Sequence, residues 1–389
     1  MSKNRAFILA LIGALTAPVW ADQPVNTAGV SVKLYGYTKL DASYDTQRTS
    51  AGDYAFYLLP LAAKKSDNDL NITARETRVG LAFSGPDTDN LKTTGKFEID
   101  FYSNGGTENA ATPRLRLAYV DIAGPHGLSL RAGQDWDAFV TVNPNTLDAA
   151  FLGDAGNLYQ RRGQLRLTEA TDLGSAKLTF RAAGARTVGQ DIDGGGADDG
   201  SDSGRPTLEG AAIVDVPLLT KKPARFSVSG ELGWETLDAS SGTTIVSPDV
   251  KTLKSRVLIG GIVFPITETV SFAGTYWKGS NLDAFYGGIG QGINKTLTRS
   301  VTASGGWGQV QADLTPTVNV NAGYGVDNPD DKDLNTGDRA VNTRKFASAY
   351  YKATSAVTFA FEYSRLHTEY KKQGPVNGDR FQGSVIYKF

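Results

Sequence analysis

The chain of 389 residues contains no cysteine, one methionine at its start and two histidines. The absence of cysteine excludes a disulfide framework, thiol chemistry and thiolate metal sites. Beyond the N-terminal segment, no stretch approaches 18 consecutive apolar residues, so the sequence predicts no transmembrane helix in the mature chain. The formal charge of −1 becomes −3 without Lys3 and Arg5, which is too balanced to indicate nucleic acid or an anionic surface as a partner.

The first 21 residues have the organisation of a secretory signal peptide. Lys3 and Arg5 precede an apolar run that begins at Ala6, and small residues surround a cleavage position after Ala21. A membrane anchor is the alternative, but the run contains Pro18 and is shorter than the roughly 20 residues that a bilayer requires. We therefore expect residues 1–21 to be removed and the exported chain to begin near Asp22.

From Val30 to the C-terminus, apolar and polar side chains alternate in about sixteen segments separated by glycine, proline and polar residues. Most segments approach the roughly 9 to 11 residues that a tilted strand needs to cross a bilayer. The last is FQGSVIYKF, in which Phe381, Val385, Tyr387 and Phe389 share one face. We predict that this terminal strand pairs with the first strand and that Phe389 lies at the periplasmic membrane interface.

Seven short turns alternate with eight long polar loops along the chain, the fifth loop at residues 237–250 and the eighth at 371–379. The fold class that this layout predicts is all-β: a transmembrane antiparallel β-barrel at residues 30–389, with short periplasmic turns and long extracellular loops. Residues 22–29 are expected to form a short periplasmic segment. Closure is required because each unpaired backbone group in hydrocarbon costs several kcal/mol, and about sixteen strands leave a lumen wide enough for water. An exported soluble sandwich, which would bury the same apolar faces in a core, is the alternative.

Several segments resemble a known family. ETRVGLAFSGP, LKTTGKFEIDFY and the ending with its terminal Phe resemble the Gram-negative outer-membrane general porins. LRAGQDWDAFVTVNPNTLDAAFLGDAGNLYQRRGQLRLT resembles the DcaP-type branch, although the chain has no room for the N-terminal coiled coil of that branch. The resemblance implies a homotrimer in the outer membrane that passes small hydrophilic solutes, with the third loop folded into the lumen. It also implies dicarboxylate uptake.

If apolar positions face lipid, their neighbours in sequence face the lumen. The lumen-facing or loop side chains that we expect to line the pore or set its selectivity are Lys33, Lys39, Glu76, Arg78, Lys96, Glu98, Arg131, Arg162, Arg166, Asp148 and Asp154. Parity is ambiguous at Arg114 and Arg116, where RLRLAYVDI places polar side chains on both faces.

Cations predominate over acids among the expected lumen-facing side chains. Guanidinium groups at Arg78, Arg131, Arg162 and Arg166 would favour carboxylate-bearing solutes through bidentate hydrogen bonds. Asp148 and Asp154 on the third loop could supply an opposing acidic edge. The alternative interpretation is that these arginines pair with nearby acids and only keep the lumen hydrated. We expect a passive channel with a mild preference for anionic solutes.

Nothing in the sequence predicts catalysis, a metal or a cofactor. The two histidines, His126 and His367, are expected on opposite sides of the membrane, and no G-x-S-x-G motif accompanies them. GGGADDGSDSG lacks the spacing of a calcium loop. The expected partners are outer-membrane lipid, ions and small hydrophilic solutes. A recognition protein or adhesin that acts through its extracellular loops is the competing function.

Overall fold

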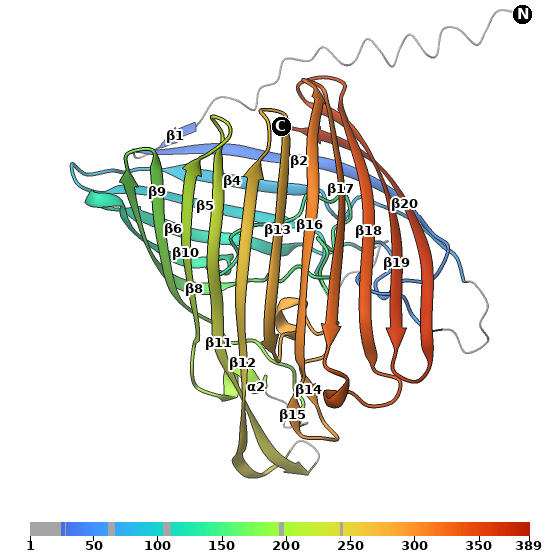
Figure 1. Cartoon of the computed structure of the whole chain (residues 1–389). Helices are drawn as coiled ribbons and strands as arrows, with labels where there is room; N and C mark the ends of the chain where they lie inside the picture. The colour runs from blue at the N-terminus through green and yellow to red at the C-terminus, as the bar shows by residue number, and fades with distance from the viewer. Residues whose placement is uncertain (1–24, 28, 61–66, 104–109, 194–197, 242–243) are drawn as a thin grey trace, which may run out of the picture.

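The computed structural model describes residues 25–27, 29–60, 67–103, 110–193, 198–241 and 244–389. The predicted signal peptide lies outside these residues. The described chain forms a closed barrel of 16 antiparallel strands with almost no helix, which confirms the predicted fold class (Figure 1).

The strands follow one another around the wall in chain order. The first half consists of β2 (Val30–Asp45), a second strand in two pieces, β3 (Asp69–Thr73) and β4 (Arg78–Ser84), then β5 (Lys92–Asp100), β6 (Arg114–Ala123), β7 (Leu128–Trp136), β8 (Arg161–Leu173) and β9 (Ala176–Ala185). The second half consists of β10 (Thr207–Pro217), β11 (Pro223–Ser241), β12 (Thr244–Pro265), β13 (Val270–Ser280), β16 (Thr302–Thr315), β17 (Val318–Pro329), β18 (Arg339–Lys352), β19 (Val357–Tyr370) and β20 (Gly374–Lys388).

The remaining elements are short and lie outside the wall strands. β1 (Val25–Thr27) pairs with the start of β2, and β14 (Ile293–Asn294) pairs with β15 (Arg299–Ser300) in the sixth extracellular loop. One helical turn, α2 (Asp199–Asp202), and the 3₁₀ turns η2 (Pro125–Gly127), η3 (Asp283–Phe285) and η4 (Asp331–Asp333) complete the structure. No helix in the described part of the chain is long and apolar enough to span a membrane.

The alternation of polar and apolar residues in the sequence corresponds to side chains that face the interior and the exterior of the barrel. On β2, Lys39, Asp41 and Ser43 are buried, whereas Leu34 and Leu40 are 42% and 49% exposed. This is the reverse of a soluble protein, in which the apolar face is covered. The outer wall is apolar and suited to lipid, and the polar side chains fill the interior.

The barrel closes between its first and last strands. β20 pairs with β2 in a register that runs from Tyr37 opposite Lys388 to Asp45 opposite Arg380. The backbones of Gly36 and Phe389 exchange two hydrogen bonds, of 3.1 and 3.2 Å. Gly36 has φ +155°, and a Cβ there would lie 2.2 Å from the carbonyl oxygen of Arg78. The pairing predicted for the terminal strand is therefore confirmed, and glycine is required where it begins.

The structure differs from the sequence prediction in the fifth and eighth extracellular connections. The fifth loop was expected at residues 237–250, but its described residues, 237–241 and 244–250, extend β11 and β12 into a two-stranded ribbon that projects beyond the rim (Figure 1). The pairing of the two strands in this ribbon is irregular, with register shifts between Leu237 and Ala239 and between Ala239 and Ser240. The eighth loop is shorter than expected because β20 begins at Gly374.

Candidate functional site

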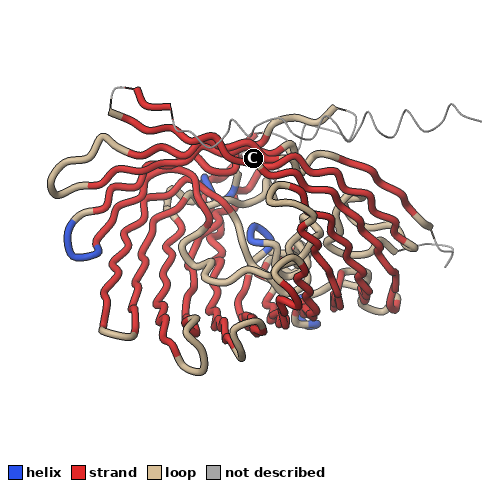
Figure 2. The backbone as a smooth tube through the Cα atoms, turned by 90° about the horizontal axis from the view of Figure 1, so that it is seen from above, coloured by secondary structure: helices blue, strands red, loops and turns tan. Residues whose placement is uncertain are grey.

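The third extracellular loop, residues 137–160, turns into the barrel and lies within the lumen (Figure 2). Its path begins at the end of β7 and returns to β8. Trp277 of β13 donates its indole N–H to the carbonyl of Gly156 at 2.8 Å, and Trp307 of β16 donates to Oδ1 of Asn157 at 3.1 Å. Ser229 of β11 donates to the carbonyl of Phe139 at 2.8 Å. The loop is thus fixed to one half of the wall.

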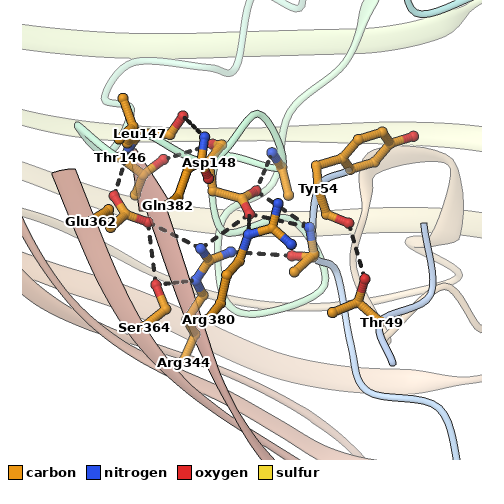
Figure 3. A network of polar contacts seen from close by, with 12 residues as sticks. Thr49, Tyr54, Thr146, Leu147, Asp148, Arg344, Glu362, Ser364, Arg380 and Gln382 are labelled. Carbon is orange, nitrogen blue, oxygen red and sulfur yellow. Dashed lines mark hydrogen bonds and ion pairs between the residues drawn. The ribbon is translucent and has the colours of Figure 1, made fainter. Parts of the chain in front are cut away.

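The tip of the loop is held by a buried network of charges (Figure 3). Oδ2 of Asp148 lies 3.2 Å from Nη2 of Arg344 and 3.1 Å from Nε of Arg380, on β18 and β20. The backbone N–H of Leu147 donates to Glu362 of β19 at 2.6 Å. Burial opposes ionisation of Asp148, but the two guanidinium groups outweigh it and hold its pKa below the ordinary value. Asp148 therefore anchors the loop and does not face the passage.

Asp154 occupies a different environment. Its backbone carbonyl accepts a 2.7 Å hydrogen bond from Nδ2 of Asn342, and its N–H donates to the carbonyl of Tyr286 at 2.7 Å. Burial raises the pKa of its carboxyl to about 7, with Arg339 opposing the shift. Asp154 is also covered, so neither loop aspartate forms an exposed acidic edge.

A narrow pocket, the candidate constriction of the passage, lies between the third loop and the wall of β4, β5, β6 and β8. Side chains of this wall and of the loops enclose it, and its volume is about 30 Å³, room for only a few water molecules. On the wall side they are Glu76, Arg78, Asp100, Tyr102, Arg114, Arg116 and Arg161, and on the loop side Tyr54, Phe56, Ala149, Phe151, Tyr159 and Tyr286.

Four arginines face two carboxylates at this constriction, so the lining carries excess positive charge. Arg114 bonds Asp100 through two nitrogens, at 2.9 and 2.7 Å, and Arg116 bonds both Glu98 at 2.7 Å and Asp100 at 2.8 Å. A register shift between Glu98 and Ile99 opposite β6 turns both arginines inward, which explains the ambiguous parity in the sequence.

Arg161, the first residue of β8, supplies the uncompensated charge. Its guanidinium lies 4.7 Å from the centre of the Trp136 ring. Within the described residues it has no acidic partner at ion-pair distance. Stacking on an aromatic face leaves the edge of a guanidinium available as a hydrogen-bond donor to an anion.

Three of the predicted arginines lie beside the constriction in ion pairs. Arg162 is 3% exposed and bonds Asp137 at 3.1 Å and Glu209 at 2.5 Å, so it fixes the start of the third loop. Arg166 bonds Asp135 at 2.8 Å. Arg131 bonds the same carboxylate at 2.6 Å and also Asp121.

The other predicted side chains lie along β2, β4 and β5. Lys39 donates to Glu76 and, at 3.1 Å, to the carbonyl of Leu147 in the third loop. Arg78 lies 3.4 Å from Glu98. Nearer the periplasmic mouth, Lys96 is exposed with its ammonium 5.5 Å from the Tyr35 ring centre, and Lys33 is also exposed.

The sequence analysis missed the aromatic side of the constriction. Phe151 and Tyr159 lie on the third loop, Tyr54 and Phe56 on the first and Tyr286 on the sixth. The ring centres of Phe56 and Tyr286 are 5.0 Å apart and stacked. Loop residues carry no strand parity, and contacts between three loops are non-local, so no pattern in the sequence indicated them.

Two acidic clusters lie on the extracellular side. Carboxylate oxygens of Asp191, Asp193 and Asp199 come within 4.8 Å of one another, as do those of Asp202, Asp238 and Asp249. Asp199 is buried and the other five aspartates are exposed or half-buried, and such acidic clusters are ordinary in surface loops. The two histidines are far apart, His126 in a periplasmic turn and His367 on β19, where Nδ1 lies 3.0 Å from Oδ1 of Asn377.

A sealed barrel with an apolar exterior, a polar interior and an infolded third loop defines an outer-membrane channel of the porin class. Residues 3–200 match the family model of the DcaP outer membrane protein. The chain belongs to this family, and it is a protein of the outer membrane. A search of curated proteins found no match.

Solved structures share the fold at low sequence identity. The outer membrane channel DcaP of Acinetobacter baumannii is 18% identical with a TM-score of 0.72, over 94% of this chain and 100% of that one. The anion-selective porin from Comamonas acidovorans is 12% identical with a TM-score of 0.58, over 92% and 100%. OmpF of Salmonella typhi, in complex with daunomycin, is 13% identical with a TM-score of 0.57, over 94% and 100%.

Proposed function

We propose that the protein is a passive diffusion channel for small hydrophilic solutes, that it prefers anionic, carboxylate-bearing solutes, and that it has no catalytic activity. The observation that carries the preference is the constriction, where four arginines face two carboxylates and Arg161 has no acidic partner within the described chain. Fixed positive charge in a narrow, low-dielectric passage lowers the energy of an anion and raises that of a cation.

Arg161, which was not among the side chains predicted to set selectivity, takes the main role, and Arg162 does not. Arg162 is neutralised by Asp137 and Glu209, so its charge is largely cancelled at the passage. Arg161, unlike Arg114 and Arg116, has no carboxylate on its guanidinium within the described chain, so its edge can donate two hydrogen bonds to the carboxylate of a solute. The channel is proposed to assemble as a homotrimer, a state supported by the trimer form of OmpT of Vibrio cholerae, which has the same fold at a TM-score of 0.59 and 11% identity.

Reversal potentials in planar bilayers under a potassium chloride gradient test the preference. We expect the wild-type channel to favour chloride, and Arg161→Gln to bring the chloride-to-potassium permeability ratio about twofold closer to one. Arg186→Gln is the matched control, because Arg186 is exposed outside the barrel and lies 3.6 Å from Asp198. A cation-selective wild type would contradict the proposal. An unchanged permeability ratio in Arg161→Gln would show that Arg161 does not contribute to the anion preference.

A recognition role is the second candidate, and the projecting ribbon of β11 and β12 favours it. Ile245 and Val246 on this ribbon are strongly exposed, as is Val250. Exposed apolar side chains on an extracellular projection are suited to contact with another protein. A purified protein that forms no conducting channels in bilayers would favour recognition over transport.

A further inference from the structure

The outer surface of β12 and β13 carries a row of basic side chains at the extracellular edge of the apolar band. Lys254 and Arg256 alternate with the buried, inward-facing Ser255 and Val257, so both point outward. Arg256 pairs in register with Ser280, and Leu258 pairs with Lys278, which places Arg256 and Lys278 diagonally across neighbouring strands. All three basic side chains are exposed.

No acidic side chain of the described residues lies at ion-pair distance from these three cations. None of their side chains makes an ion pair or hydrogen bond to another described residue. On the same rim, four strands further around the wall on β19, Arg365 bonds Asp379 at 2.7 Å. Next to the row, the guanidinium of Arg205 lies 5.6 Å from the ring centre of Trp234, which is the register partner of Lys254. The result is a concentrated positive patch beside an aromatic residue at the membrane interface.

An apolar groove of about 630 Å³ lies directly below the patch on the same strands. Val228, Ile262, Phe272 and Tyr276 line it, and Val228 and Tyr276 are 59% and 64% exposed. The groove exists because Gly260 points outward: a Cβ there would meet no atom within 4 Å. β11, β12, β13 and β16 run side by side here (Figure 1).

We propose that this surface is a binding site for a phosphate-bearing lipid of the outer leaflet, such as a bisphosphorylated glycolipid. Its phosphates would contact Arg256, Lys254 and Lys278, and one acyl chain would lie in the groove. Arginine binds phosphate oxygens in a bidentate manner, and basic clusters at a membrane surface attract anionic head groups. The basic patch lies on the extracellular side of the apolar groove. The head groups of the outer leaflet lie in the same way on the extracellular side of their acyl chains.

A second copy of this chain fits the surface less well. A subunit contact over this surface would bury three cations that have no ion-pair partner among the described residues, and burying unpaired charge is costly. No acidic side chain of the described residues neutralises the row from its own strands. A phosphate-bearing lipid matches both the basic patch and the apolar groove, whereas a purely apolar or a purely charged partner would match only one of them.

Native mass spectrometry of the detergent-solubilised full-length protein with bisphosphorylated lipid A tests the head-group half of the proposal. The variant combines Lys254→Gln, Arg256→Gln and Lys278→Gln, and we expect it to bind the lipid at least about tenfold more weakly than the wild type. The matched control, Lys221→Gln, Lys222→Gln and Lys352→Gln, removes three charges at the periplasmic rim and should bind as the wild type does. Heat-modifiable migration on gels confirms that each variant is folded.

The groove half is tested by Gly260→Phe, which fills the open space and leaves every charge in place. We expect weaker lipid A binding in this variant, and weak binding of dephosphorylated lipid A by the wild type. Equal binding of lipid A by the wild type and both site variants would overturn the proposal. The proposal would also be overturned if Gly260→Phe no longer showed the mass of the oligomer while its lipid A binding was unchanged. That result would show that another subunit, and not a lipid, occupies the groove.

Discussion

At the scale of single residues, Asp148 and Asp154 show how one loop can bury two carboxylates with opposite consequences. Asp148 faces Arg344 and Arg380, whereas Oδ1 of Asp154 has no hydrogen-bond partner within the described chain. The first carboxylate is stabilised as an anion and the second is not. The two residues therefore respond in opposite directions to pH and to replacement by asparagine.

Asp148→Asn should destabilise the folded barrel. Removing one partner of a buried ion pair leaves the others uncompensated and typically costs about 3–5 kcal/mol. Because the pKa of Asp148 is depressed in the folded state, its contribution is present at neutral pH and is lost as pH falls through that depressed pKa. Thermal unfolding followed by circular dichroism in detergent at pH 7 should show a lower midpoint. An unchanged midpoint would show that the network in Figure 3 does not hold the loop.

Asp154→Asn should stabilise the protein above pH 7. The folded pKa of about 7 exceeds the ordinary value of 3.8, so the wild type should lose stability as pH rises between these values and keep the full penalty above the higher one. The expected gain at pH 8 is on the order of a few kcal/mol at most. Unfolding midpoints at pH 5 and pH 8 measure it, with a gain only at pH 8. A gain of equal size at both values would attribute the effect to packing and not to charge.

Strand parity correctly identified most inward-facing side chains but could not identify which of them the third loop covers. Arg162 and Arg78 have the same inward parity, yet Arg162 is buried beneath the loop and Arg78 lines the passage. The difference depends on the path of a 24-residue segment whose contacts lie up to 235 positions away in sequence, as between Leu147 and Gln382. No local pattern encodes such contacts.

At the scale of elements, the third loop is positioned by close backbone approach as well as by charge. Gly156 has φ +112°, and a Cβ there would lie 2.1 Å from the carbonyl oxygen of Gly306 on β16. Any side chain at this position must push the loop away from the wall, towards the passage or out of the lumen. The position of the third loop against the wall therefore depends on Gly156.

Gly156→Val should displace the loop and change the pore. The strain of a β-branched residue at this φ is roughly 1–3 kcal/mol before the steric clash is added. Single-channel conductance should shift away from the wild-type value, with larger current fluctuations. Gly163→Val is the control, since a Cβ there meets no atom within 4 Å. Identical conductance in the wild type and Gly156→Val would show that the loop tolerates the displacement.

The elements themselves were largely predictable, and their exceptions have local causes. The alternating pattern and the turn residues located sixteen strands because a sealed barrel in lipid requires both. The ribbon of β11 and β12 escaped prediction because it stands above the membrane, where neither face has to be apolar. The inward orientation of both Arg114 and Arg116 could not be predicted, because a register shift between β5 and β6 interrupts the alternation of inward and outward side chains there.

At the scale of the whole molecule, the barrel has two unlike halves. The third loop, which connects β7 and β8 of the first half, packs against the inner face of the second half, from β10 to β20, at Trp277, Trp307 and Phe346. The first half presents the arginine wall to the passage. The loop thus fills one side of the lumen and confines solutes to the charged side. Both halves depend on one seam, where the first strand of the barrel, β2, pairs with the last, β20.

Deletion of Phe389 tests that seam. The residue exchanges two backbone hydrogen bonds with Gly36, and its ring approaches to 3.1 Å of where a Cβ on Gly36 would lie. Each hydrogen bond contributes about 1 kcal/mol, and their loss exposes strand ends at the membrane surface, where the cost is higher. We expect a lower unfolding temperature and faster loss of the folded band on heat-modifiable gels. Phe389→Ala, which keeps the backbone bonds and loses the ring, should lie between the deletion and the wild type. If the deletion unfolds at the wild-type temperature, the last residue does not contribute to closure, and the barrel is sealed by the pairs between Tyr37 and Asp45 alone.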